Sequence, residues 1–152
     1  MNFTPVSRSF RLFRILCIFS DSSGYRLGVY DCDSKLTYSR QLGIDEVARD
    51  NIAVYEARAL VFCIQNIKLR ANVRVVRIHC DNLICVNAFK DFQGCRNPEI
   101  NEIVKQLINW QRRHNVLIEI TYIPTAQNLA DAPSREIFQE ELSVSNRFIR
   151  LV

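Results

Sequence analysis

The sequence lacks the features that would direct a chain into a membrane or out of the cell. No apolar run approaches the roughly 20 residues that are needed to cross a bilayer. Arginines precede the first apolar stretch, but that stretch runs directly into Asp21 without a small-residue cleavage site, so we expect no signal peptide. We therefore expect an intracellular protein, in the cytoplasm or nucleus, with no membrane partner.

Cysteine pairs at metal-binding spacing are also missing. None of the six cysteines belongs to a C-x-x-C pair. Cys17, Cys63 and Cys80 lie inside apolar segments, where a thiol behaves as a small hydrophobic group. We predict reduced cysteines in the core rather than disulfides or zinc ligands.

The composition is that of one ordinary domain. The 152 residues include 48% hydrophobic residues, which is ample for a core. The net charge of +4 permits a polyanionic partner but does not require one. We expect an arm or linker over residues 1–12, a domain over 13–135 and a C-terminal extension over 136–152.

Apolar periodicity predicts the element order β-β-β-α-β-α-α-β. The first three strands can form an antiparallel meander, and the later strand–helix–strand order indicates a parallel crossover, so the chain reads as α/β with a mixed sheet. The predicted strands cover residues 14–20, 25–30, 36–42, 73–80 and 116–123, and the predicted helices cover about 51–69, 82–92 and 98–114.

Four acidic residues lie where these elements could bring them together. Asp21 ends the first apolar strand, where a charge is costly unless a metal or a cation meets it. Glu56 borders the apolar stripe of the first helix, and Asp81 directly follows the fourth strand. Asp131 lies in the loop after the last strand. Because acids at the carboxyl ends of parallel strands are common site positions in α/β sheets, we predict that the four converge if the first and fourth strands are neighbours.

Convergence would create a metal site. Taken singly, each acid has an ordinary explanation as a turn residue, a helix-dipole partner, a cap or a loop residue. Taken together, four acids in one cleft repel one another unless divalent cations are bound. Oxygen ligands suit Mg²⁺ or Mn²⁺, and two such ions about 3.5–4 Å apart can activate a water and stabilise the leaving oxygen in phosphodiester hydrolysis.

These residues also carry a family resemblance. Asp21-Ser22-Ser23 is similar to an Asp-(Gly/Ala)-Ser opening, and Cys80-Asp81-Asn82 resembles a (Thr/Ser)-Asp-(Asn/Ser) stretch. Residues 122–135, YIPTAQNLADAPSR, resemble the pattern His-Ile-Pro-Gly…Asn…Ala-Asp…Leu-Ser-Arg. Over roughly residues 14–135 the chain resembles the ribonuclease H domains of retroelement reverse transcriptases, of the DIRS type and related elements.

The resemblance implies a ribonuclease H-like α/β fold, with a mixed five-stranded sheet and helices packed on both faces. It implies a two-metal endoribonuclease that hydrolyses the RNA strand of RNA–DNA hybrids with two Mg²⁺ ions, for which Mn²⁺ can substitute. Asp21 would bridge both metals, Glu56 and Asp81 would hold one, with Glu56 near the RNA 2′-hydroxyl, and Asp131 would complete the other. A neighbouring reverse transcriptase domain of the same polyprotein would be a further partner.

The chain departs from the family pattern at two points. Tyr122 stands where the family has a mobile histidine, which implies slower turnover, and the basic substrate-binding helix of some members is missing. Contacts to the hybrid would then depend on other residues. The candidates are Ser23, Asn82, Arg96 and Asn128, for which turn and capping roles are the ordinary explanation.

Two other functions fit the same sequence. The domain could be a ribonuclease H fold repurposed as a protein-interaction or scaffold module with weak or no catalysis, which the missing histidine and the apolar residues of the tail favour. Those tail residues are Phe138, Leu142, Phe148 and Ile149. It could also be another nuclease of the same superfamily that acts on DNA.

Overall fold

The computed structural model describes residues 13–45, 51–91 and 95–135, which contain a five-stranded sheet with the strand order β3-β2-β1-β4-β5. Its strands are β1 (Arg14–Ser22), β2 (Arg26–Asp31), β3 (Leu36–Gln41), β4 (Val73–Cys80) and β5 (Leu117–Tyr122). β1, β2 and β3 pair antiparallel, whereas β4 pairs parallel with both β1 and β5. The predicted meander and parallel crossover are confirmed, and the predicted arm and extension lie outside the described residues.

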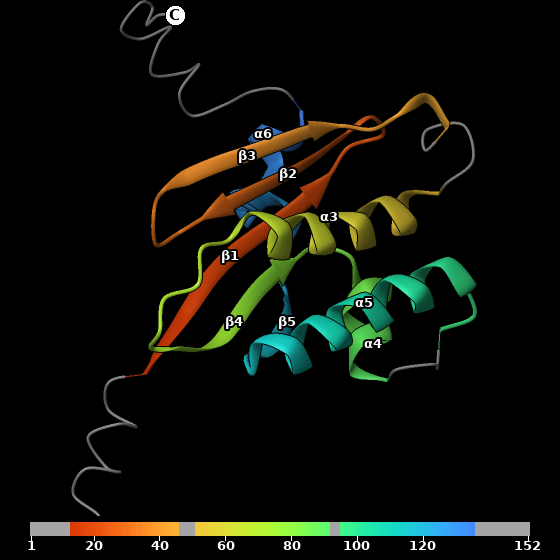
Figure 1. The fold of residues 1–152 in the computed structure, drawn as a ribbon. Coiled ribbons are helices and arrows are strands. Elements are labelled where there is room, and N and C mark those ends of the chain that lie inside the picture. Colours follow the sequence, from red (N-terminus) through yellow and green to blue (C-terminus); the bar gives the residue numbers. More distant parts are fainter. Residues whose placement is uncertain (1–12, 46–50, 92–94, 136–152) are drawn as a thin grey trace, which may run out of the picture.

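Helices cover both faces of this sheet, as predicted. Figure 1 shows α3 and α5 across one face and the short α6 behind β2 and β3 on the other. The helical segments are α3 (Ile52–Asn66), α4 (Leu83–Lys90), α5 (Pro98–His114), the 3₁₀ turn η1 (Thr125–Gln127) and α6 (Asp131–Ser134). Among the described residues, no helix is both long and apolar enough to span a bilayer.

The core lies between the sheet and α3, α4 and α5. Burial alternates along β1: Leu16 and Ile18 are buried, whereas Cys17 and Phe19 are only half-buried. This period of two places Leu16 and Ile18 on the core face with Leu60 of α3, and each such fully buried side chain contributes about 1.5–3 kcal/mol. The alternation gives the sheet one dry face and one partly open face.

All six cysteines are free thiols in the structure. Cys63 and Cys80 are fully buried, as expected. Cys17 is the exception, because it lies on the partly open face of β1. The apolar run around it indicated a strand but not which face each residue takes.

Three asparagines fix where the long helices begin. The side chain of Asn51 accepts a hydrogen bond from Val54 N–H, and Asn82 and Asn97 cap α4 and α5 in the same way. α3 ends at Asn66 rather than at the predicted Leu69, because Ile67 adopts extended backbone with ψ of 148°. The last described helical residue of α4 is Lys90, and the predicted end at residue 92 lies outside the described part of the chain.

Gly28 allows α6 to lie directly on β2. A Cβ atom at this position would be 2.4 Å from Ser134 N, 2.8 Å from Ala130 O and 2.9 Å from Pro133 C. All three are backbone atoms, so they cannot move aside as the end of a flexible side chain would. β2 and α6 can therefore touch only because residue 28 has no side chain.

We expect Gly28→Ala to lower the free energy of unfolding by about 2–3 kcal/mol, because the added methyl group displaces α6 from the sheet. Urea unfolding followed by circular dichroism measures the change. Gly24→Ala is the matched control: a Cβ there meets nothing within 4 Å, so its effect should stay below about 1 kcal/mol. Equal effects of the two substitutions would contradict the close approach of α6.

Candidate active site

Three carboxylates from distant parts of the sequence meet at one end of β1 and β4. Asp21 lies in β1, Glu56 in the second turn of α3, and Asp81 directly after β4. One carboxylate oxygen from each lies within 4.8 Å of the others. The pairing of β1 with β4 ends at Phe19 and His79, so both aspartates lie just beyond the last paired residues, where the strands separate.

Burial makes this grouping unusual. Asp21 is 3% exposed and Glu56 is 4% exposed, whereas Asp81 is partly exposed. Glu56 Oε1 is buried without a hydrogen-bond partner. A buried carboxylate oxygen without a partner costs free energy, and such atoms are rare in folded proteins. The site thus contains an acceptor that the protein itself does not satisfy.

The pKa values respond to this environment. Burial raises the pKa of Glu56 far above its ordinary value, and the neighbouring Asp21 and Asp81 carboxylates raise it further. Burial and Asp81 likewise raise the pKa of Asp21, although the hydrogen bond from Ser22 N–H partly opposes them. Without a cation, the group therefore retains protons that isolated carboxylates would have lost at neutral pH.

Two hydrogen bonds hold Asp21 in place. Ser22 N–H donates to Asp21 Oδ1 at 2.9 Å, and the Ser134 hydroxyl lies 3.2 Å from Asp21 Oδ2 and 2.8 Å from the Asp131 carbonyl oxygen. Ser134 is fully buried. Ser134 was not among the predicted site residues, although it matches the serine at the Ser-Arg end of the motif over residues 122–135 and lies about one helical turn after Asp131.

Asp131 lies close to the group but is not part of it. It begins α6, and its negative charge contributes to the raised pKa of Asp21. Its Oδ1 accepts a hydrogen bond from Arg135 Nε at 3.0 Å. Both side chains are about half exposed, and exposed ion pairs of this kind contribute only about 0–1 kcal/mol. The pairing with Arg135 therefore fixes the Asp131 carboxylate only weakly.

Three of the four residues expected to touch nucleic acid are engaged within the protein. The Ser23 hydroxyl accepts hydrogen bonds from Tyr25 and Arg26 N–H in the turn after β1. Asn82 caps α4. The buried Asn128 donates from Nδ2 to Ser20 O at 2.9 Å and accepts from Ala130 N–H at 3.0 Å, so it ties the loop before α6 to β1.

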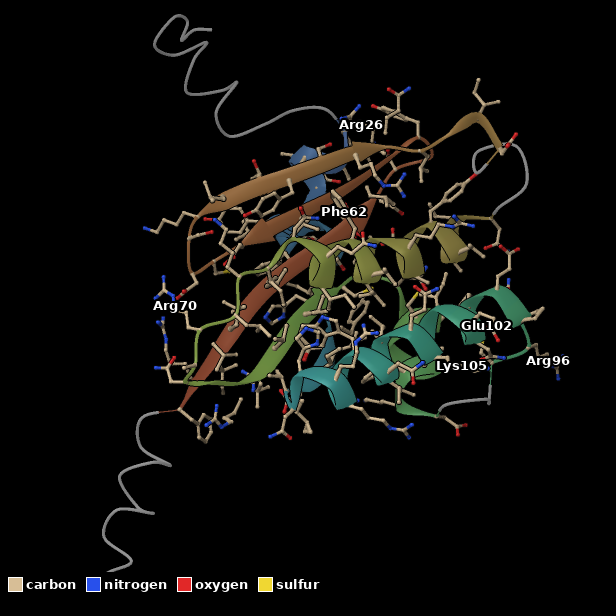
Figure 2. All side chains as sticks on the ribbon, viewed as in Figure 1. Arg26, Phe62, Arg70, Arg96, Glu102 and Lys105 are labelled. Atoms are coloured by element: carbon tan, nitrogen blue, oxygen red, sulfur yellow. The ribbon has the colours of Figure 1, made fainter. Side chains whose placement is uncertain are left out.

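The fourth candidate, Arg96, and the tyrosine at the expected histidine position are open to solvent. Arg96 is exposed, and in Figure 2 it points away from the body of the protein beside the start of α5. Tyr122 ends β5, opposite Cys80 at the end of β4, and is 45% exposed. The tyrosine that replaces the expected histidine thus lies at the same end of the sheet as Asp81.

The donor set fits a divalent cation. Three carboxylates offer hard oxygen ligands, which suit Mg²⁺, Mn²⁺ or Ca²⁺ better than soft metals. A cation there would be coordinated by the unpartnered Glu56 oxygen and would relieve the repulsion between the carboxylates. Asp21, Glu56 and Asp81 could hold such an ion.

Comparison with known proteins gives structural neighbours only, since no protein-family model and no curated protein matches the chain. LC11-RNase H1, isolated from compost by a metagenomic approach and solved in complex with an RNA/DNA hybrid, is similar with a TM-score of 0.63 and 19% identity, covering 84% of this chain and 99% of that one. RNase H1 of Halobacterium salinarum is similar with a TM-score of 0.59 and 12% identity, covering 86% and 98%. The N-terminal RNase H domain of a Mycobacterium tuberculosis protein is similar with a TM-score of 0.58 and 17% identity, covering 81% of this chain and 92% of that one. The chain therefore has the ribonuclease H fold.

We expect Glu56→Gln to stabilise the metal-free protein. Since folding raises the pKa of Glu56 above its ordinary value of 4.5, the folded state keeps a proton that the unfolded chain loses as the pH rises above that value. The wild-type free energy of unfolding therefore falls from pH 4.5 upward, whereas the variant has no such proton to lose. In a chelator, urea unfolding should show the variant more stable by about 2 kcal/mol at pH 8 and similar to wild type at pH 4.

Glu102→Gln provides the control. Glu102 is exposed on α5 beside Lys105, with 3.2 Å between Lys105 Nζ and Glu102 Oε2, so its loss should change stability by less than about 0.5 kcal/mol at either pH. Addition of Mg²⁺ should reduce the difference in free energy of unfolding between wild type and Glu56→Gln at pH 8, because the ion binds the wild type more tightly. A Glu56→Gln variant less stable than wild type at pH 8 in chelator would show that Glu56 is not under electrostatic strain.

Proposed function

We propose that the protein is a metal-dependent endoribonuclease that hydrolyses the RNA strand of RNA–DNA hybrids. The observation that carries the proposal is the meeting of Asp21, Glu56 and Asp81, two of them buried, at the carboxyl ends of the neighbouring parallel strands β1 and β4. The fold supports the choice of substrate, because a similar structure, LC11-RNase H1, was solved with an RNA/DNA hybrid.

In this proposal Asp21, Glu56, Asp81 and Asp131 together hold two Mg²⁺ ions, for which Mn²⁺ can substitute. When bound, the ions would supply an activated water and stabilisation of the leaving oxygen of the phosphodiester. Asp131 would complete this set of ligands, and its exposed ion pair with Arg135 contributes too little free energy to prevent that.

The protein's own residues position this chemistry. Ser22 N–H and the Ser134 hydroxyl restrict the orientation of the Asp21 carboxylate before any ion arrives. Asn128 fixes the loop that carries Asp131 against β1. Glu56, buried and rigid on α3, would face the 2′-hydroxyl that distinguishes RNA from DNA. Tyr122 lacks a basic nitrogen to accept protons, so we expect slower turnover than with a histidine in its place.

We also propose an origin in a retroelement, with a reverse transcriptase domain of the same polyprotein as the neighbour that helps to hold the hybrid. The support for this is the motif resemblance of residues 122–135 and the engagement of Ser23, Asn82 and Asn128 in internal hydrogen bonds. With those side chains committed to the fold, Arg96 is the candidate that remains free to contact the backbone of a hybrid.

The direct test is cleavage of an RNA–DNA hybrid labelled on the RNA strand. With Mg²⁺ or Mn²⁺ the wild type should cut internal RNA phosphodiesters, and a chelator should stop cleavage. Asp81→Asn, which removes one charge from the group, should lower the rate by about 100-fold or more. Asp91→Asn is the matched control, because Asp91 is exposed at the end of α4 and should retain wild-type activity.

Three duplexes of one sequence separate the alternatives. Cleavage of the hybrid but not of double-stranded DNA or double-stranded RNA supports the proposal. Preference for double-stranded DNA would instead indicate a DNA nuclease of the same fold. If folded wild type cuts none of the three with either ion, the domain is better explained as a protein-interaction module.

A further inference from the structure

Two thiols lie side by side on the partly open face of the sheet. Cys17 is in β1, and Cys32 directly follows β2. The last paired residues of these strands are Ile18 and Asp31, so Cys17 and Cys32 are the next opposed pair, and Cys32 N–H donates to Cys17 O at 3.1 Å. Residues directly opposed in an antiparallel ladder point their side chains to the same face.

This placement suits a disulfide. Hydrogen-bonded pairs of opposed residues have Cα atoms about 5.5 Å apart, which lies within the range of roughly 4.4–6.8 Å that disulfides span. Burial raises the pKa of Cys32, and the neighbouring Cys17 thiol raises it further, so the two thiols lie close enough to interact. The Cβ atoms of such pairs lie about 5 Å or more apart, beyond the roughly 3.5–4.5 Å of a relaxed disulfide. A bond between the two sulfur atoms therefore draws β1 and β2 slightly together, and the resulting strain makes the disulfide easy to reduce.

Exposure and pairing together distinguish this pair from the other cysteines. Cys17, Cys32 and Cys95 are half-buried, whereas Cys63, Cys80 and Cys85 are fully buried, and of the three half-buried cysteines only Cys17 and Cys32 are opposed in the sheet. Cys17 Sγ lies 3.2 Å from His79 Nε2, and the His79 ring stacks on Phe19 with 4.6 Å between centroids. The stacked imidazole orients the Cys17 sulfur and leaves it accessible from the partly open face.

We propose that Cys17 and Cys32 form an oxidisable dithiol site that reacts with hydroperoxides. The Cys17 thiol loses its proton to solvent and its sulfur attacks the peroxide, so an S–O bond forms, the O–O bond breaks, and the alkoxide or hydroxide leaves and takes up a proton. The Cys32 thiol then attacks the Cys17 sulfenic acid and loses its proton, which forms the S–S bond and releases water. In total, two thiols and one hydroperoxide give one disulfide, one alcohol or water, and one further water.

The site is separate from the proposed nuclease chemistry. Its product would close a covalent loop over residues 17–32, which includes Asp21, and would tie β1 to β2 at the end away from the three acids. The proposal does not depend on hybrid cleavage, so it stands or fails by thiol chemistry alone.

Peptide mapping of the wild-type chain tests the pairing. Cleavage after lysine and arginine places Cys17 in residues 15–26 and Cys32 in 27–35, with Cys63 in 59–68, Cys80 and Cys85 in 78–90, and Cys95 in 91–96. After limited hydrogen peroxide treatment, we expect peptides 15–26 and 27–35 to appear as one disulfide-linked species that dithiothreitol separates. The thiol titre should fall from six to four.

Variants show whether the two residues act together. Cys32→Ser should abolish the link and leave Cys17 as a sulfenic acid that a dimedone probe traps, whereas Cys95→Ser, the control at a half-buried cysteine, should leave the link unchanged. Circular dichroism checks folding, and Cys32→Ala replaces the serine variant if the hydroxyl disturbs the turn. Two outcomes would overturn the proposal. In the first, Cys95 or a cysteine within residues 78–90 is oxidised before Cys17 and Cys32. In the second, peptides 15–26 and 27–35 stay unlinked while Cys95 is oxidised.

Discussion

Repulsion between buried carboxylates is the constraint on which the rest of this structure depends. Asp21 and Glu56 are almost fully enclosed, and Asp81 lies within reach of both, so folding must place like charges together in a medium that screens them poorly. The apolar core beneath α3 and the pairing of β1 with β4 supply the free energy that holds them there. Without a cation, the group relieves this repulsion by keeping protons, as the raised pKa values of Asp21 and Glu56 indicate, so a cation that binds there takes the place of those protons.

On the far side of the sheet, α6 contributes to the site because its backbone lies directly against β2. α6 is only four residues long, yet Gly28 lets its backbone lie on β2, and this brings Ser134 within hydrogen-bond reach of Asp21. Asn128 fixes the preceding loop to β1 in the same region. Gly28, which has no side chain, and the buried polar residues Asn128 and Ser134 thus fix the position of the backbone that carries Asp131.

Local patterns predicted the elements well, and the site only in outline. Period-two and helical spacing identified all five strands and the three long helices, and the position of Asp21 and Asp81 at strand ends predicted their meeting. The sequence could not show that Asn128 faces β1 rather than solvent, because its contact with Ser20 joins residues more than one hundred positions apart in the chain. The pairing of Asp131 with Arg135 is local, and their spacing of four residues was a signal that could have indicated it.

The parallel pairing of β1 with β4 also has a consequence for the order of folding. It joins residues about sixty positions apart, such as Phe19 and His79, whereas β1, β2 and β3 are linked by short turns. Because closing a long loop costs more entropy than closing a hairpin, the meander can form during synthesis while the inner edge of β1 still lacks its neighbour. Until β4 leaves the ribosome, that edge is open to strands of other chains, and the acids have not yet been brought together.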